Sequence, residues 1–480
     1  MSLPFPRTSP ESAGIPSFAI ENFLREVDAQ TIPLHSFMLL RHGKVCAEGW
    51  WKPYAADMQH IIYSCSKSFT SVAIGFCVQE GRLTLDDKVI DFFPDKLGEA
   101  SKHPFIASRT IRNLLMMSTG NAYAIDRTAP DWIKTFLNTV PPVRPGALFG
   151  YDSSGTHTLS GIVQRVTGQN LMEYLKPRLL DPLGIEGAWC EMSPMGICVG
   201  HRGIHCLTED MARFGQFLLQ KGMWNGKQLL DPAYLEAATS RQIATNTKNT
   251  KLDSNAGYGY QFWRLRNNAF ACIGTGAQLI VVLPDEDLVF ITTGNALQGD
   301  ADYEEFPEVI HLFWNQIYPH LSKGPLPENP AAQAALAAHC DALELYLPAG
   351  KDNSPLEAAV SGNRYEFPEN PSGIRTIGVE FSEDTLRLTV ALPESDWVIE
   401  AGRHDWRRQH LDPAPDEGWA KFVWSDEKTL LCEANCRWRC GTYHFLLHFD
   451  EGCASVQIRP SGWSHFGRLY LRSTGTQVNA

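Results

Sequence analysis

Residues 61–80 read IIYSCSKSFTSVAIGFCVQE, and this stretch carries signals for both the fold and the chemistry of the chain. Apolar residues recur at helical spacing from about Ser64 to Glu80, which predicts a buried helix. Ser64 and Lys67 lie three residues apart at the start of that helix, so their side chains share one face. A serine hydroxyl needs a neighbouring base, and a lysine becomes one when apolar surroundings lower its pKa. The stretch therefore predicts a nucleophile at Ser64 with Lys67 as its proton acceptor.

The same S-x-x-K spacing also occurs at Ser425 and Lys428, so spacing alone has little weight. That second pair sits between charged residues in a β-prone region, where water would keep the lysine charged and inert. The first pair lies at a helix start among apolar residues. Sequence context therefore favours Ser64 over Ser425.

The regions on either side of this helix predict sheet and helix in turn. Residues 36–50 indicate two strands around a tight turn, and helical patterning continues to about residue 230. Residues 258–295 alternate β-prone runs with turn signals, as antiparallel strands do. Residues 303–321 indicate a closing helix packed on that sheet, and the proline-rich run 322–330 then ends regular structure.

A chain of 480 residues exceeds what one hydrophobic core usually supports, so two domains are expected. We expect an α+β catalytic domain at residues 1–325 and an accessory all-β domain at residues 326–480, a barrel or a sandwich. A short helix at residues 331–346 would lead into the second domain. The β prediction rests on short runs such as RTIGVEF, TLRLTVAL and YHFLLHF.

The amino-acid composition limits the classes of binding partner that are expected. The formal net charge of -12 argues against nucleic-acid and anionic-membrane surfaces, and favours a small-molecule substrate. The first residues lack a signal-peptide pattern, no apolar run reaches membrane-spanning length, and 12 cysteines are scattered rather than clustered. A soluble, cytoplasmic protein is expected, and a homo-oligomer is compatible with the sequence.

Several further stretches, together with the first S-x-x-K pair, resemble the β-lactamase-like serine hydrolases. They are ESAGIP, IRNLLMMSTGN, RPGALFGYDSSGTHTLSGIVQRVTGQNLMEYL, LLDPLGI and GTGAQLIVVLPDEDLVFITTGN. That family includes class C β-lactamases, D,D-carboxypeptidases, esterases and 6-aminohexanoate-dimer hydrolases. The resemblance covers about the first 320 residues. It implies an antiparallel sheet flanked by helices, a helical subdomain and a serine nucleophile.

The resemblance also implies roles for particular residues. Tyr151 occupies the tyrosine of the family's Tyr-x-Asn motif and would work with Lys67 as general base, then return the proton to the leaving group. Ser153 stands where the family has asparagine and would contact substrate. With Tyr151, the expected catalytic trio is Ser64, Lys67 and Tyr151.

The family's third motif, Lys-Thr-Gly or His-Thr-Gly on an edge strand, falls at residues 272–274, where only Gly274 matches. The backbone N–H groups of Thr275 and Ser64 would then form the oxyanion hole, and Gly274 would let the strand approach the substrate. A register one or two residues later would put Gly276 in that place instead.

These departures shape the expected substrate. Cys272 lacks the charge that family members use near a substrate carboxylate, and Ser153 lacks an amide's paired donor and acceptor. We therefore expect a carboxylesterase or small-amide hydrolase. A β-lactamase or D,D-peptidase is the alternative within the same chemistry, and a ligand-binding sensor without turnover is the alternative from another class.

Aromatic residues could wall the substrate pocket or simply pack in the core. Tyr63, Trp189 and Tyr258 are the substrate-contact candidates, with Tyr260 and Trp263 beside them.

No cofactor and no metal are expected. Cys432, Cys436, Cys440 and His444 recur every four residues, but zinc ligands usually come in tighter pairs, and in a strand this spacing only returns side chains to one face. His201 and His205 lack an acidic partner between them and are better explained by a loop that lines the cleft.

Overall fold

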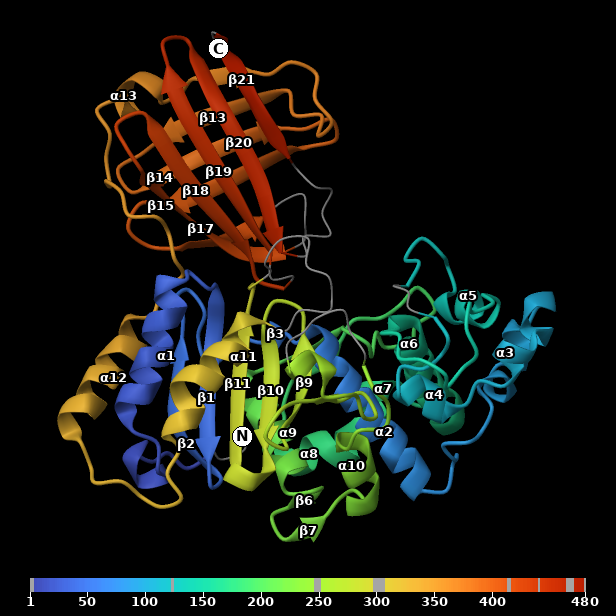
Figure 1. The fold of residues 1–480 in the computed structure, drawn as a ribbon. Coiled ribbons are helices and arrows are strands. Elements are labelled where there is room, and N and C mark those ends of the chain that lie inside the picture. Colours follow the sequence, from blue (N-terminus) through green and yellow to red (C-terminus); the bar gives the residue numbers. More distant parts are fainter. Residues whose placement is uncertain are drawn as a thin grey trace. The chain divides into compact units, whose positions relative to one another are not determined.

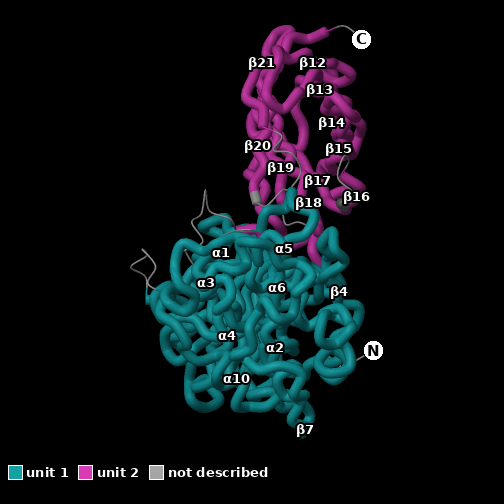
Figure 2. The backbone as a smooth tube through the Cα atoms, turned by 90° about the vertical axis from the view of Figure 1, so that its right-hand side faces the viewer, with its two compact units in different colours: residues 1–50, 56–294, 298–342 teal, residues 51–55, 295–297, 343–480 magenta. Residues whose placement is uncertain are grey.

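The computed structural model describes residues 4–121, 125–245, 252–296, 307–411, 416–438, 441–462 and 470–478. The chain forms two compact units (Figure 2). Unit 1 comprises residues 1–50, 56–294 and 298–342, and unit 2 comprises residues 51–55, 295–297 and 343–480.

The centre of unit 1 is a six-stranded antiparallel sheet with the order β2-β1-β11-β10-β9-β8 (Figure 1). Its strands are β1 (Leu34–Arg41), β2 (Lys44–Trp50), β8 (Trp263–Arg264), β9 (Phe270–Gly274), β10 (Gln278–Leu283) and β11 (Leu288–Gly294). The expected hairpin at residues 36–50 and the expected antiparallel strands of residues 258–295 are both present. The sheet joins the first and last parts of the unit, since β1 pairs with β11.

Helices cover both faces of this sheet. Phe23 of α1 (Ser17–Ala29) contacts the ring of Phe290 at 5.6 Å, whereas α9 (Thr208–Leu219) lies against Val289 on the same strand. Neighbouring residues of a strand point to opposite faces, so α1 and α9 lie on opposite sides. A Cβ on Gly215 of α9 would lie 2.6 Å from Val289, so a glycine is needed for this close packing.

Apart from the helices within residues 308–342, the remaining helices of unit 1 lie mainly beyond β9, where α2 separates the sheet from the helical region (Figure 1). All but the last two residues of α2 are buried, including its lysine, serine and threonine side chains. The helices are α2 (Ser66–Gln79), α3 (Pro104–Ala107), α4 (Ile111–Leu115), α5 (Trp132–Leu137), α6 (Ser153–Thr167), α7 (Leu171–Leu175), α8 (Asp181–Leu183) and α10 (Pro232–Thr239).

Two small sheets complete unit 1. One contains β3 (His60–Ile61), β5 (Ile204–Cys206) and β4 (Trp189–Cys190), in that order, and the other is the hairpin of β6 (Met223–Trp224) and β7 (Lys227–Gln228). The first matters for function because β3 ends directly before the turn that carries Ser64.

In its described residues, unit 2 is all-β apart from the short helix α13 (Glu357–Val360). Its ten strands have the order β15-β14-β13-β12-β21-β20-β19-β18-β17-β16, and an additional pairing of β15 with β17 closes the sheet into a barrel-like form. They are β12 (Arg364–Glu366), β13 (Thr376–Phe381), β14 (Thr385–Ala391), β15 (Asp396–Gly402), β16 (Arg407–Leu411), β17 (Asp416–Trp424), β18 (Thr429–Cys436), β19 (Gly441–Asp450), β20 (Cys453–Gly462) and β21 (Leu471–Val478). Burial alternates along β14, so one face of each strand lines the core.

These features confirm the α+β class and the C-terminal all-β domain, but the units divide later than the expected boundary at residue 325. Helix α12 (Pro330–Ala342) belongs to unit 1 because it packs on α1. His339 of α12 bonds Glu21 and Asp28 of α1, at 3.1 and 2.8 Å. The helix expected to lead into the second domain is therefore part of the first unit.

The closing helix is shorter and less regular than expected from residues 303–321. It consists of α11 (Glu308–Leu312), one π-helical turn at Phe313–Ile317 and a 3₁₀ turn at Tyr318–His320, while residues 303–306 lie outside the described residues. Phe313 stacks on Phe290, which confirms its packing on the sheet. No described helix combines the length and the apolar character needed to cross a membrane.

Candidate active site

Ser64 lies in a single 3₁₀ turn, Tyr63–Cys65, between β3 and α2. Neighbouring elements hold this turn from both sides. The Ile62 N–H donates to the carbonyl of Ile204 in β5 at 2.9 Å, and the Cys65 thiol donates to the carbonyl of Gln278 in β10 at 3.2 Å. Ser64 itself is half-buried, so its hydroxyl sits on a fixed support at a partly open position.

Lys67 lies one turn further along, on the first turn of α2. Its Nζ donates to Ser64 Oγ at 2.9 Å and to the carbonyl of His201 at 2.8 Å, and the side chain is 1% exposed. Burial, followed by the nearby charge of Arg202, lowers the pKa of Lys67 from 10.5 to about 7. A substantial fraction of Lys67 is therefore neutral near pH 7, which a proton acceptor requires.

The second S-x-x-K pair has a different environment. Ser425 and Lys428 follow β17 in a turn of unit 2, and the lysine is exposed and pairs with Asp450 at 2.8 Å. This hydrogen bond raises the pKa of Lys428. The pair thus keeps an ordinary charged lysine, in agreement with the preference for Ser64.

Tyr151 lies beside Lys67 and stands two residues before the first residue of α6. The Lys67 ammonium lies over its ring, 4.9 Å from the centroid. The next residue, Asp152, caps α6 by accepting the N–H groups of Ser154 and Gly155, and its buried carboxylate also accepts the Thr119 hydroxyl at 2.6 Å. The structure thus brings Ser64, Lys67 and Tyr151 together from two helix starts.

Strand β9 passes directly beside the turn of the nucleophile. A Cβ on Gly274 would lie 2.5 Å from the carbonyl oxygen of Ile62, so no side chain fits there. Thr275 and Gly276 form the turn into β10, where Gly276 has a φ of 82° and the Gln278 side chain donates to the Thr275 carbonyl at 3.0 Å. These contacts favour Gly274 as the point of close approach.

The Cys272 side chain is buried on the same strand. Burial raises the pKa of its thiol to about 12, so the thiol is neutral over the physiological pH range. The position predicted from the resemblance for the cationic or imidazole group of the third motif is therefore uncharged. Ser153 is the first residue of α6 and is half-buried.

Comparison with known proteins agrees with this architecture. A family model described as Beta-lactamase matches residues 20–312, more than half of the chain. The chain belongs to the beta-lactamase family. Its fold and its relatives place it among the beta-lactamase-fold serine hydrolases, which confirms the resemblance noted from the sequence.

Three relatives of this beta-lactamase family member illustrate the range. A 6-aminohexanoate-dimer hydrolase of Paenarthrobacter ureafaciens is 26% identical over 278 residues, covering 53% of this chain and 71% of the relative. A family VIII carboxylesterase structure covers 66% of this chain and 99% of its own, with a TM-score of 0.52 and 15% identity. The octameric penicillin-binding protein homologue from Pyrococcus abyssi covers 95% and 99%, with a TM-score of 0.51 and 17% identity. The two structures establish a shared fold.

The three aromatic substrate-contact candidates of this beta-lactamase family member lie in different surroundings. Tyr258 is buried, and its ring lies 6.3 Å from that of Tyr151 at 85°. Tyr63 is buried in the turn of the nucleophile, with a φ of 40°. Trp189 lies on β4, is 40% exposed and stacks on His205 at 3.9 Å. Substrate contact by any of them stays a prediction.

The four-residue cysteine pattern lies in unit 2. Cys432 and Cys436 are buried in β18, Cys440 lies outside the described residues, and His444 bonds Glu433 and Ser461, each at 2.9 Å. Across the described ranges, no group of three metal-binding side chains comes together.

Three contributors to the site were not assigned from the sequence. The His201 carbonyl holds Lys67, Arg202 lowers the pKa of Lys67, and Asp152 fixes the main chain beside Tyr151. The sequence predicts that the His201–His205 loop lines the cleft, but it does not indicate that this loop contacts Lys67. Only the Asp-Ser-Ser-Gly run after Tyr151 could have revealed one of the three, because it matches a helix N-cap.

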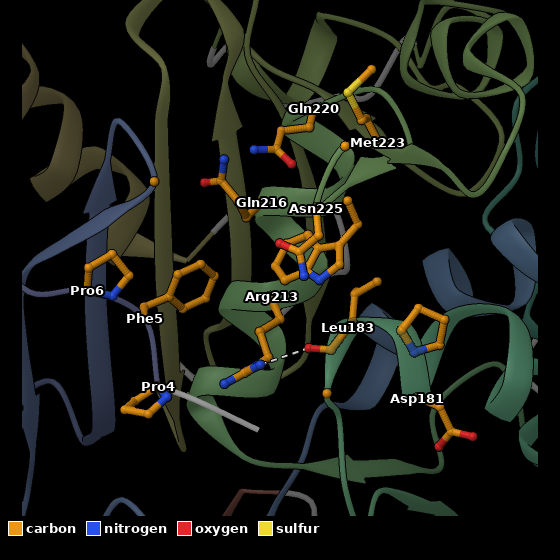
Figure 3. A pocket seen from close by; sticks show the side chains of 15 residues that line it. Pro4, Phe5, Pro6, Asp181, Leu183, Arg213, Gln216, Gln220, Met223 and Asn225 are labelled. Carbon is orange, nitrogen blue, oxygen red and sulfur yellow. Dashed lines mark hydrogen bonds between the residues drawn. The ribbon is translucent and has the colours of Figure 1, made fainter. Parts of the chain in front are cut away.

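A separate groove of about 910 Å³ lies elsewhere on unit 1, between the N-terminal segment, α8, α9 and the β6–β7 hairpin (Figure 3). Phe5, Leu183 and Trp224 supply apolar walls, and Arg213 donates to the Leu183 carbonyl at 2.8 Å. None of the predicted site residues lines this groove.

Proposed function

We propose that the chain is a carboxylesterase or small-amide hydrolase that forms an acyl-enzyme on Ser64. The observation that carries the proposal is the contact of 2.9 Å between Ser64 Oγ and the Lys67 amine, whose pKa is lowered to about 7. A nucleophile within hydrogen-bond reach of a base that is partly neutral at pH 7 is what acyl transfer requires.

Acylation begins when Ser64 Oγ attacks the carbonyl carbon of the substrate. A new bond forms from Oγ to carbon, and the hydroxyl proton passes to the neutral amine of Lys67, with Tyr151 assisting. The negative charge that develops on the carbonyl oxygen is held by the backbone N–H groups of Ser64 and Thr275. Fixed donors of this kind are worth about 10²–10³-fold in rate each.

The tetrahedral intermediate then collapses. The bond from carbon to the leaving oxygen or nitrogen breaks, and Tyr151 delivers the proton to that atom while Lys67 replenishes it. Water enters, loses a proton to the same groups and attacks the acyl carbon. The Ser64 ester bond breaks, the carboxylic acid leaves, and the hydroxyl regains its proton, so the cycle is balanced without a cofactor.

The substrate proposal rests on the neutral third motif. Cys272 supplies no positive charge beside the nucleophile, so the site lacks at that position the partner for a β-lactam carboxylate. An ester or a small amide does not need that partner. The relative named for 6-aminohexanoate dimer adds a linear amide to the candidates.

The test compares a fluorophosphonate probe, a p-nitrophenyl acyl ester, 6-aminohexanoate dimer and a chromogenic cephalosporin. The variants are Ser64→Ala and Ser425→Ala, which remove the serine of one S-x-x-K pair each. We expect the wild type and Ser425→Ala to be labelled and to hydrolyse the ester, and Ser64→Ala to do neither.

Other outcomes reject the proposal in distinguishable ways. Absence of labelling and of turnover in the wild type would contradict a hydrolase. Rapid cephalosporin turnover would identify a β-lactamase instead. Labelling of Ser64 without turnover of any substrate would support a ligand-binding sensor of this fold.

A further inference from the structure

Tyr151 must present its hydroxyl to the leaving group, yet its main chain fixes only part of that position. Two of its neighbours are anchored, since the Gly150 N–H donates to the Met117 carbonyl at 2.8 Å and Asp152 caps α6. The phenol still turns about two side-chain bonds. Proton transfer tolerates displacements of only about 0.5 Å and roughly 10–20°. Something other than the backbone must therefore hold the ring.

The ring of Tyr151 stacks on Trp263. The two ring planes are 19° apart and their centroids are separated by 5.6 Å, an offset stack. The Lys67 ammonium lies 4.9 Å from the centre of the same phenol ring. Tyr151 is thus held by a flat apolar surface and by the base with which it exchanges a proton.

Trp263 is rigid enough to serve as that surface. It is 7% exposed, and it lies on β8 with Ala271 of β9 as its partner in the sheet. Its ring meets Tyr258 at 4.9 Å and 85°, and Phe149 at 5.6 Å and 65°. The strand next to β8 carries Gly274, so the ring that stacks on Tyr151 and the proposed oxyanion hole come from neighbouring strands of one sheet.

We propose that Trp263 is a positioning residue that holds Tyr151 at the angle needed to protonate the leaving group. This inference rests on the proposed function. Trp263 acts through Tyr151 and need not touch substrate. Its loss therefore impairs proton delivery to the leaving group more than it impairs nucleophilic attack on the carbonyl.

Two esters of one carboxylic acid separate these effects. A p-nitrophenolate leaves without a proton, whereas an ethoxide must be protonated as its bond breaks. For each enzyme we measure kcat/KM, which reports acylation, with the p-nitrophenyl and ethyl esters of butyric acid. A change in the ethyl-to-p-nitrophenyl ratio isolates proton delivery, because a reduced fraction of folded enzyme or a lost contact to the shared acyl group lowers both values equally.

The variants are Trp263→Leu, Trp263→Phe and Trp224→Leu, the last a tryptophan that lines the separate groove. We expect Trp263→Leu to lower the ratio about tenfold or more, which is part of the 10²–10⁴-fold that general acid–base catalysis contributes. Trp263→Phe keeps a flat ring and should stay within about threefold of the wild type, and Trp224→Leu should leave the ratio unchanged.

An unchanged ratio in Trp263→Leu would overturn the inference, and so would an equal fall of the ratio in Trp224→Leu. Equal losses for Trp263→Phe and Trp263→Leu would also overturn it, because a phenyl ring preserves a stacking surface. If the wild type hydrolyses neither ester and Ser64 is not labelled, the proposed function has failed, which is a different result from an unaltered ratio in an active enzyme.

Discussion

Replacing the candidate base should make the protein more stable while it abolishes activity. In Lys67→Met, a side chain of similar length fills the same buried space without an amine to desolvate. The wild-type amine is 1% exposed, and its pKa is lowered from 10.5 to about 7. Such a lysine is charged in the unfolded chain and largely neutral in the folded one above pH 7, which costs folding free energy.

The magnitude follows from linkage. The cost is absent above pH 10.5, where both states are neutral, and grows by about 1.4 kcal/mol per pH unit as the pH falls towards 7. It amounts to about 4 kcal/mol at pH 7 and about 2 kcal/mol at pH 9. The variant also loses two hydrogen bonds, worth about 1–1.5 kcal/mol each. We expect a net gain of about 1–2 kcal/mol at pH 7 that vanishes near pH 9.

The assay is denaturant unfolding of the full chain at pH 7, 8 and 9. Hydrogen exchange of peptides from α2 assigns the transition to unit 1, since a two-unit chain need not unfold in one step. Lys227→Met, at an exposed position on β7, is the matched control and should change stability by less than about 0.5 kcal/mol at every pH.

One result would refute the reasoning. If Lys67→Met is less stable than the wild type at pH 7, by an amount that does not vary up to pH 9, then Lys67 is charged in the folded protein. A permanently charged lysine could not accept the Ser64 proton, and the general-base assignment would fall with the stability prediction.

Three further predictions test neighbouring groups. Arg202→Met removes the charge that, after burial, most lowers the Lys67 pKa, so the acid limb of log kcat/KM against pH should move to higher pH by about one unit; an unmoved limb would exclude this coupling. Asp152→Ala removes the cap of α6 and the 2.6 Å acceptor of the buried Thr119 hydroxyl, so denaturant unfolding should reveal a loss of about 2–4 kcal/mol, and Asp152→Asn should lose less. Gly274→Ala forces a Cβ to within 2.5 Å of a carbonyl oxygen, so ester kcat/KM should fall at least about tenfold, whereas Gly324→Ala, with open space around it, should match the wild type.

The part of the site that the sequence could predict depends on local geometry. Ser64 and Lys67 lie three residues apart, and any helix that begins there brings their side chains to one face. Burial of that helix is also predicted by the sequence, because apolar residues recur along it at helical spacing. Tyr151 needed the resemblance to a family, since nothing local relates a loop tyrosine to a helix that lies far away in the chain.

The parts that the sequence could not predict depend on contacts between distant segments. The carbonyl that holds Lys67 belongs to His201, and a carbonyl leaves no signature in a sequence. The stack of Trp263 on Tyr151 joins an edge strand to a helix start. The C-terminal limit of unit 1 differs from the prediction for the same reason. A proline-rich run suggested a domain boundary before α12, but His339 of α12 bonds Glu21 of α1.

The charges around Lys67 connect these observations to the substrate. The resemblance predicts that Cys272 stands where β-lactamases carry a cationic or imidazole group near the substrate carboxylate, and its thiol is neutral. The like charge that lowers the Lys67 pKa comes instead from Arg202, which pairs with Glu191 at 3.4 Å. A positive charge therefore contributes to the low pKa of Lys67, and it comes from Arg202, next to His201, rather than from a residue of β9. A site with this arrangement can activate Ser64 without a cation on the strand beside the scissile bond, and for that reason we expect neutral esters and amides to be its substrates.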